Sequence, residues 1–342
     1  MRVLITGSDG YIGSVLSPLL IDNNHQVTGM DTGYFRDQVL YGNDNLNDMS
    51  PPIKDFRNIQ VDELSGYDVV VHLAGLSNDP WGRLNPELTY KINHGESVLF
   101  AKKCKEAGVQ TFIFSSSCSV YGIGDSELKT EESDPNPQTV YAKSKVLAER
   151  DISKLANHSF SPVYLRNATV YGPSPRMRFD IVLNNLSGLA WTTHKIEMIS
   201  DGLPWRPLVH IEDVCEAFRL VIETPRETVH NEIFNIGDTH ENYQVKDIAN
   251  IVDNTFPDCE TTLGQNADNR SYRVSFDKFH QAFPEFSCRH NVKQGAEELQ
   301  SVYSSIGMQA DTFFDKAYTR LDKIKYLRDS NQIDAELYWQ SS

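Results

Sequence analysis

Short, uninterrupted apolar runs that alternate with helical patterns are the feature that most restricts how this chain can fold. Strand-like runs lie at residues 2–6, 25–31, 67–74, 111–115 and 162–172, and helical patterns at 11–22, 86–107 and 141–156. Strands that are buried on both faces carry continuous rather than alternating apolar residues. Repeated alternation of such strands with helices predicts an α/β fold, a Rossmann-type doubly wound parallel sheet.

The pattern changes after Pro173. Helical stretches near 178–190, 244–255, 292–305 and 310–328 are separated there by loops rich in Gly, Pro, Asn and Asp. The stretches 209–222 and 234–237 still resemble pieces of the sheet domain. We therefore expect one domain of residues 1–173 with about 205–237, and a smaller, interleaved α/β lobe of residues 174–204 and 238–342.

Composition excludes several classes of function. The net charge of −15 argues against nucleic-acid binding, which usually needs a basic surface. The five scattered cysteines form no C-x-x-C pair, and the ten histidines show no metal-ligand spacing, so we expect neither a disulfide framework nor a metal site. No run approaches the ~20 apolar residues of a membrane span. The start, MRVLITG, lacks the features of a signal peptide, so a cytoplasmic protein without a membrane partner is expected.

A glycine-rich loop follows the first strand. In TGSDGYIGSVL (6–16), Gly7, Gly10 and Gly13 lie between a strand and the start of a helix. Glycines let the backbone approach a pyrophosphate, whose charge is favoured at a helix N-terminus. The strand–loop–helix setting is the context that such a motif requires, although a plain tight turn is the alternative. We expect the three glycines, with Tyr11 and Ile12, to bind a dinucleotide.

An acidic residue ends the second strand. Asp31 lies 18 residues after Gly13. A carboxylate at this place accepts hydrogen bonds from a ribose 2′-hydroxyl and repels a 2′-phosphate. Asp31 therefore favours NAD over NADP, while Arg36, close by in the sequence, works against that preference.

Tyr141 and Lys145 form a candidate catalytic pair in the run YAKSK. Residues four apart on a helix share one face. An ammonium group near a phenol lowers the phenol pKa from its usual value of about 10, so the tyrosine can act as a base near neutral pH. Y-x-x-x-K is common by itself. Here it follows a glycine-rich loop and a strand that ends in serines, FIFSSSCSVYG (112–122).

These motifs together resemble those of the extended short-chain dehydrogenase/reductases, particularly the NAD-dependent nucleotide-sugar epimerases and dehydratases. The similarity covers roughly residues 1–280. Its motifs are TGSDGYIG, Asp31, HLAG (72–75), SSSCSVYG (115–122), YAKSK (141–145), LRNATVYGP (165–173) and WRPLVHIEDV (205–214). The resemblance implies NAD as cofactor, a nucleotide-sugar substrate and a homodimer, with NAD on the first domain and the substrate on the smaller lobe.

The same resemblance implies roles for individual residues. The catalytic residues are Ser117, Tyr141 and Lys145, with Lys145 also holding the nicotinamide ribose. The residues expected to bind or position the cofactor are Gly7, Gly10, Tyr11, Ile12, Gly13, Asp31, Asp55, Phe56, Leu73, Ala74, Gly75, Asn93, Ser115, Tyr141 and Lys145, with Asp55 and Phe56 at the adenine. The residues expected to bind the substrate are Ser117, Asn167, Thr169, Asn184, Arg206 and Arg270, with the two arginines at the phosphates.

Two departures from the family pattern affect the expected sugar pocket and the expected reaction. Many relatives have asparagine where this chain has Thr169, and here an asparagine appears at position 167 instead. The 4,6-dehydratases of the family that this chain resembles carry an Asp-Glu pair where this chain has Cys118 and Ser119. A thiol and an alcohol are poor replacements for two carboxylates in elimination of water. We therefore expect an epimerase acting at C4. A keto-sugar reductase or dehydrogenase is the alternative, and a dehydratase or a non-catalytic dinucleotide sensor is less favoured.

Overall fold

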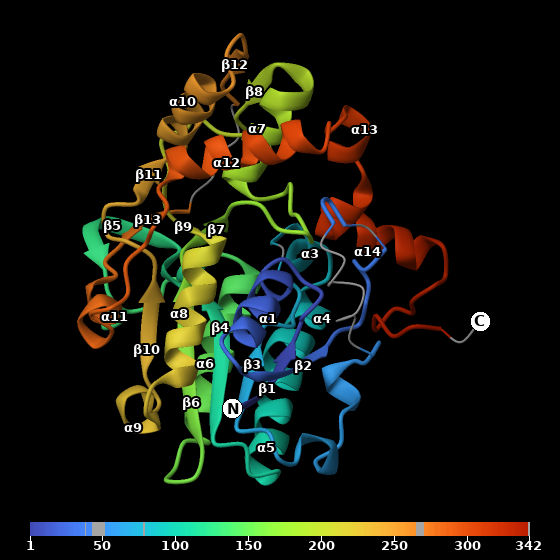
Figure 1. Cartoon of the computed structure of the whole chain (residues 1–342), viewed down its shortest axis with the longest axis vertical. Helices are drawn as coiled ribbons and strands as arrows, with labels where there is room; N and C mark the ends of the chain where they lie inside the picture. Colours follow the sequence, from blue (N-terminus) through green and yellow to red (C-terminus); the bar gives the residue numbers. More distant parts are fainter. Residues whose placement is uncertain (38, 43–51, 78, 265–269, 341–342) are drawn as a thin grey trace.

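The computed structural model describes residues 1–37, 39–42, 52–77, 79–264 and 270–340 (Figure 1). A parallel sheet of six strands lies at its centre, in the order β10-β6-β4-β3-β1-β2. Its strands are β1 (Arg2–Thr6), β2 (Gln26–Met30), β3 (Val69–His72), β4 (Thr111–Ser117), β6 (Ser161–Asn167) and β10 (Ile233–Ile236). The predicted doubly wound parallel sheet is confirmed.

Helices cover both faces of this sheet because its strands are apolar on both sides. In β1, Val3 and Ile5 belong to one buried cluster, and Leu4 belongs to the other. The helices on the first face include α1 (Gly13–Asp22) and α8 (Ile211–Glu223), which pack against each other. On the second face lie α4 (Pro86–Tyr90), a π-helical turn (Lys91–Glu96), α5 (Ser97–Glu106) and α6 (Val140–Ser153).

Strand order places the binding region. β1 has β2 on one side and β3 on the other, so the chain direction across the sheet reverses between β1 and β3. Ligands of such sheets bind at the carboxyl ends of the strands beside that reversal. Beyond β2, the described residues add a single parallel bridge between Asp31 and Ile53.

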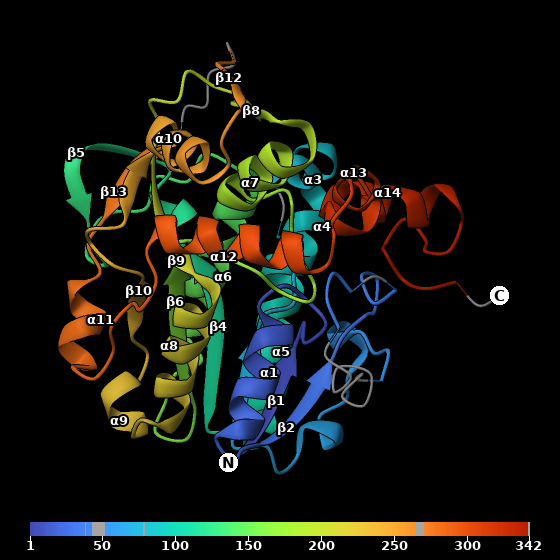
Figure 2. The same ribbon diagram turned by 45° about the horizontal axis from the view of Figure 1, so that its top comes forward.

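A lobe built from later parts of the chain extends from one end of the sheet (Figure 2). Its main helices are α7 (Val182–Thr193), α10 (Val245–Thr255) and α12 (Val292–Ser305), which pack on one another. Short sheets join it to the rest: β7 (Thr169–Tyr171), β9 (Trp205–His210) and β11 (Asn242–Gln244); β8 (Lys195–Glu197) and β12 (Glu260–Thr262); β5 (Ile123–Lys129) and β13 (Ser271–Val274). The remaining helices outside the C-terminal segment are α3 (Asp79–Leu84), α9 (Arg226–Val229) and α11 (Asp277–Ala282).

The C-terminal segment does not form the single helix expected over 310–328. It divides into α13 (Ala310–Phe313), a 3₁₀ turn (Lys316–Tyr318) and α14 (Arg320–Asp329). The division follows from Asp315, whose carboxylate accepts the backbone N–H of Ala317 and starts the 3₁₀ turn. The predicted boundary between two domains stays a prediction. The helix α14 and the tail that follows it pack into the same buried cluster as Phe56, through Ile324, Leu327, Ile333 and Leu337.

None of the helices in the described residues combines the length and apolar character needed to cross a bilayer.

Candidate active site

A cavity of about 1430 Å³ lies at the carboxyl ends of the central strands. Pockets for one drug-sized ligand measure roughly 300–1,000 Å³, so this cavity has room for a dinucleotide and a second ligand. The predicted residues that line it are Gly7, Gly10, Tyr11, Ile12, Gly13, Asp31, Asp55, Phe56, Leu73, Ala74, Gly75, Ser115, Ser117, Tyr141, Lys145, Asn167, Thr169, Arg206 and Arg270. Motifs far apart in the sequence therefore meet at one site.

The glycine-rich loop is too tightly folded for side chains at two of its glycines. Gly7 has a φ of +77°, which favours glycine, and a Cβ there would lie 2.8 Å from the backbone nitrogen of Ala74. A Cβ on Gly13 would lie 2.3 Å from the carbonyl oxygen of Gly7. α1 begins at Gly13, so its free N–H groups face the cavity end where a phosphate is favoured.

Asp31 is fixed at the cavity wall by two backbone groups. The N–H of Asp9 donates to its Oδ2 at 3.1 Å and the N–H of Gly33 to its Oδ1 at 2.8 Å. Burial and the nearby charge of Asp9 raise the pKa of Asp31 to about 6. From the sequence, Arg36 was expected to weaken the preference for NAD over NADP. In the structure it donates its Nε–H to Asp9 at 2.7 Å. Its charge is therefore already engaged beside the site.

The affinity for NAD should depend on pH through Asp31. A ribose hydroxyl donates to the ionised carboxylate, so binding favours the charged form, which predominates above about pH 6. We expect the Kd for NAD to be lowest at neutral pH and to rise as the pH falls from 7 to 5. Calorimetry across this range measures the effect. Asp31→Asn should flatten the profile, and an unchanged slope in that variant would assign the titration to another group.

The predicted adenine contacts lie in a 3₁₀ turn (Phe56–Asn58). Asp55 caps this turn by accepting the backbone N–H of Arg57, and the Nε–H of the same arginine donates to its Oδ2 at 2.9 Å. Phe56 is buried and lines the cavity. The pairing with Arg57 holds the carboxylate of Asp55 in place at the wall.

Asn93 differs from the other residues predicted to bind or position the cofactor, because it does not line the cavity. It is buried in the π-helical turn. Its side-chain oxygen accepts the N–H of Leu76 at 2.7 Å, and its amide nitrogen donates to the carbonyl of Leu76 at 3.0 Å. A Cβ on Gly75 would lie 3.0 Å from the same oxygen. Asn93 therefore supports the loop after β3 from behind.

Asn184 corrects a predicted substrate contact. This side chain is fully buried and does not line the cavity. Its amide forms hydrogen bonds with other groups of the protein. The oxygen accepts the N–H of Gly172 at 3.1 Å, and the nitrogen donates to the hydroxyl of Tyr11 and the carbonyl of Arg178, each at 3.1 Å. Asn184 joins the glycine-rich loop to the segment after β7, while its neighbour Asn185 lines the cavity.

Ser117, Tyr141 and Lys145 meet at the end of β4, as predicted. Lys145 is buried, and its ammonium donates to the carbonyl of Ser115 at 2.7 Å. The ammonium lies 5.7 Å from the centre of the Tyr141 ring. Ser117 ends the strand and its Oγ accepts the N–H of Ser119. The hydroxyl-rich end of the strand thus faces one side of α6.

The electrostatics of Tyr141 differ from the sequence expectation. Burial and the charge of Asp79 raise its pKa to about 12, while the charge of Arg178 and a hydrogen bond with Ser117 lower it. We expected Lys145 to supply the main lowering. Burial instead lowers the pKa of Lys145 itself to about 8. Arg178, which sequence reasoning missed, is the cation whose charge most favours the phenolate of Tyr141 in the protein alone.

Arg178 and its partner lie just after β7. The guanidinium forms two bonds of 2.9 Å to the carboxylate of Asp180 and donates to Ser77 Oγ at 3.2 Å. Both members of the ion pair line the cavity. The run PRMRFD carries no motif that would distinguish Arg178 from a surface residue.

Cys118 and Ser119 have separate surroundings. The thiol of Cys118 is buried and donates to the carbonyl of Arg166, and burial raises its pKa well above the usual value. Such a thiol is neither a proton donor to a substrate nor a nucleophile. Ser119 lines the cavity, and its hydroxyl has no protein hydrogen-bond partner among the described residues.

The two predicted phosphate-binding arginines lie together. Arg206, in β9, donates to the carbonyl oxygens of Trp205 and Arg270. The guanidinium of Arg270 pairs with the carboxylate of Asp79. Both arginines line the cavity, where they place positive charge.

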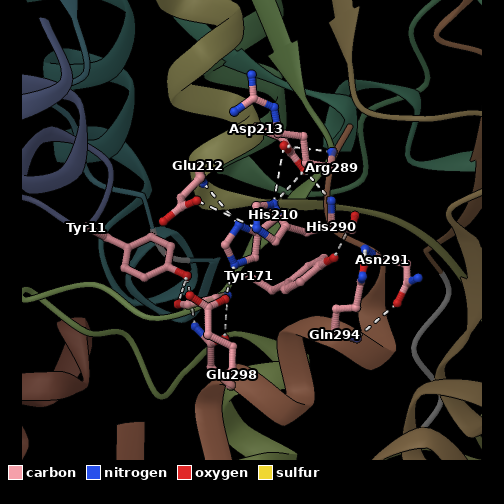
Figure 3. Close-up of polar contacts among 12 residues, drawn as sticks. Tyr11, Tyr171, His210, Glu212, Asp213, Arg289, His290, Asn291, Gln294 and Glu298 are labelled. Atoms are coloured by element: carbon pink, nitrogen blue, oxygen red, sulfur yellow. Dashed lines mark hydrogen bonds and ion pairs between the residues drawn. The ribbon is translucent and has the colours of Figure 1, made fainter. Parts of the chain in front are cut away.

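A second polar cluster surrounds His210 and His290 (Figure 3). His210 Nε2 is 2.8 Å from an oxygen of Glu298, and the rings of His210 and His290 are 4.0 Å apart. His290 contacts the carboxylate of Asp213 at 3.4 Å. The potential metal-ligand atoms of His210, Glu212 and His290 lie within 4.8 Å of one another, a grouping that sequence spacing did not predict. Existing contacts already engage both imidazoles, and the cluster connects α8 to α12.

Comparison with known proteins agrees with this geometry. The NAD dependent epimerase/dehydratase family matches residues 3–237. An uncharacterized UDP-glucose epimerase of Bacillus subtilis (strain 168), YtcB, is 30% identical over 267 residues, which cover 74% of this chain and 82% of that protein.

Two solved structures share the fold at lower identity. The NDP-hexosamine 5,6-dehydratase TunA has a TM-score of 0.79 and 24% identity, over 89% of this chain and 98% of that one. A UDP-glucuronic acid 4-epimerase from Bacillus cereus, bound to UDP-glucuronic acid and NAD, has a TM-score of 0.75 and 23% identity, over 89% and 100%. The family match spans more than half of the chain and includes the loop, the serine-ended strand and the Tyr–Lys helix. The chain therefore belongs to the NAD-dependent epimerase/dehydratase family, the enzymes that act on nucleotide sugars.

Proposed function

We propose that the protein is a nucleotide-sugar 4-epimerase that acts through a transient 4-keto sugar. The observation that carries this proposal is the composition of the end of β4. Ser117 faces the Tyr–Lys pair there, whereas Cys118 and Ser119 replace the two carboxylates that the 4,6-dehydratases carry. The naming of the Bacillus subtilis relative as a UDP-glucose epimerase supports the same reaction.

The residues of the cavity fit NAD. Gly7 and Gly13 allow the loop before α1 to pack tightly against its own backbone and that of Ala74, and both glycines line the cavity together with Asp31 at the end of β2. Tyr141 and Lys145 line the same cavity. When bound, NAD supplies a carbon that can accept a hydride and return it.

The chain itself would move the proton and hold the sugar. The Tyr141 phenolate takes the proton of the C4 hydroxyl as hydride leaves C4, and returns it to the new hydroxyl. Ser117 shares this hydrogen bond, and the Lys145 ammonium places positive charge beneath the phenol. Arg206 and Arg270 bind the diphosphate of the nucleotide sugar. The keto sugar turns between the two hydride transfers, so that hydride returns to its opposite face.

Conversion without added cofactor tests this proposal against its main rival. Purified protein is incubated with a panel of UDP-linked and dTDP-linked sugars, and products are identified by NMR while absorbance of NADH is followed. We expect a 4-epimer with no net change in NADH. A reductase or dehydrogenase would instead change NADH in proportion to product, and that outcome would reject the epimerase. If the protein does not bind NAD at all, both the epimerase and the reductase or dehydrogenase are rejected.

We also propose a homodimer, on the family resemblance alone. Light scattering coupled to size-exclusion chromatography should give a mass of about twice 38.8 kDa. A mass equal to one chain at micromolar concentration would contradict the dimer without affecting the proposed chemistry.

A further inference from the structure

We propose that Arg320, the first residue of the C-terminal helix α14, binds the diphosphate of NAD. This contact would add to the one made by the glycine-rich loop, and it rests on NAD binding in the cavity described above. The family match ends at residue 237, so it assigns nothing to this residue.

Arg320 is buried at the cavity wall without an acidic partner. Only 6% of its surface is exposed, and it lines the same cavity as the glycine-rich loop. Its guanidinium lies 4.0 Å from the centre of the Phe35 ring and donates to the carbonyl of Arg176 at 3.3 Å. Among the described residues, no carboxylate forms an ion pair with it. A buried charge is costly unless it is paired, so this site favours an anionic ligand.

The charges around Arg320 indicate which part of the ligand it meets. Asp31, the residue expected at the adenosine ribose, lines the same cavity and interacts electrostatically with Arg320. Arg178 and Asp180 also interact with Arg320, and Arg178 interacts in turn with Tyr141, the residue expected at the nicotinamide end. The diphosphate of NAD is the anionic part that connects these two ends. A guanidinium suits phosphate because its planar donors can form paired hydrogen bonds.

Positive charge is already concentrated here. Burial and the charges of Arg178 and Arg176 lower the pKa of Arg320 to about 9, although Asp180 and Asp31 act in the opposite direction. A bound diphosphate would offset this repulsion between the three arginines.

The C-terminal tail holds Arg320 in place over the cofactor-binding half. Lys323, on the same helix, pairs with Asp37, and the Trp339 Nε1–H donates to the carbonyl of Thr32 at 2.6 Å. Figures 1 and 2 both show α14 beside α3 and α4. A guanidinium held by packing is pre-positioned, which favours tight binding of its ligand.

Calorimetric titration with NAD, ADP, adenosine and UDP tests the assignment. Arg320→Gln removes the charge, Arg320→Lys keeps it, and Lys325→Gln removes a charge from an exposed position of the same helix. We expect Arg320→Gln to raise the Kd of NAD and ADP by about tenfold or more, the equivalent of one charge-assisted contact. Adenosine and UDP should bind as in the wild type, Arg320→Lys should recover part of the affinity, and Lys325→Gln should change nothing.

The remaining outcomes overturn the assignment. Equal weakening of adenosine and ADP would mean that Arg320 supports the pocket generally. Weakening of UDP alone would place it at the phosphates of the sugar nucleotide. Unchanged NAD affinity in a folded Arg320→Gln variant would reject the contact while leaving the proposed epimerase intact. Thermal melting of each variant without ligand shows whether it is folded. If Arg320→Gln does not fold, the test passes to Arg320→Lys, in which the preference for ADP over adenosine should be smaller than in the wild type. An unchanged preference in that variant would reject the contact.

Discussion

Tyr141→Phe should reduce kcat by about 10²–10⁴-fold, the usual contribution of a positioned general base. The variant keeps the ring but loses the phenolic oxygen, which as phenolate accepts the proton in the proposed reaction. NAD affinity should change far less than kcat, because Tyr141 is only one of the residues expected to contact the cofactor, and the glycine-rich loop, Asp31 and Lys145 are intact. Single-turnover and steady-state rates, together with NAD titration, separate the two effects.

The pH profile of the wild type gives this prediction a second readout. Burial raises the pKa of Tyr141 to about 12 in the protein alone, so little phenolate is present at neutral pH. Activity requires the phenolate, so kcat should rise with pH until the pKa of Tyr141 in the loaded enzyme is reached. Tyr326→Phe, at an exposed tyrosine, is the matched control. Wild-type kcat in Tyr141→Phe would show that another group is the base.

Arg166→Met should lower the free energy of unfolding by about 3–5 kcal/mol, because it leaves a buried carboxylate unpaired. Arg166 pairs with Glu149 at 2.7 Å, and their side chains are 4% and 6% exposed. Arg166 also donates to the hydroxyl of Tyr121 at 3.0 Å, and Ser116 donates to Glu149. Glu149 lies four residues after Lys145 on α6, so the two side chains share one face of that helix.

Urea denaturation measures the change. The double variant Arg166→Met with Glu149→Leu should recover most of the lost stability, because it removes both charges together. Lys293→Met, in an exposed pair with Glu297, should change the free energy of unfolding by less than about 1 kcal/mol. A loss of similar size in Arg166→Met and Lys293→Met would show that the buried pair has no special weight.

The sequence predicted the parts of this protein that depend on local pattern. Continuous apolar runs located the central strands, and the glycine spacing located the loop before α1. The Tyr141–Lys145 spacing correctly placed both residues on one helix face, because helix geometry alone determines it. These features require no knowledge of distant contacts.

Features that depend on long-range contacts were not predictable. Asn184 was expected to bind the substrate, but its amide is bonded to Gly172 and to Tyr11, and Tyr11 lies 173 residues away along the chain. Arg320 lies outside every recognised motif and reaches the cavity only because the C-terminal tail folds back over the first half of the chain. The pKa of Tyr141 likewise depends on burial and on Arg178, neither of which a sequence pattern reveals.

The fate of hydrogen during turnover tests the central claim most directly. The protein is incubated in D₂O with the nucleotide sugar that it accepts, and the product is analysed by NMR and mass spectrometry. Hydride that leaves C4 and returns to C4 never exchanges with solvent, so the account predicts a 4-epimer of unchanged mass with no deuterium on any ring carbon. Loss of water with deuterium bound to carbon would identify a dehydratase and contradict the account.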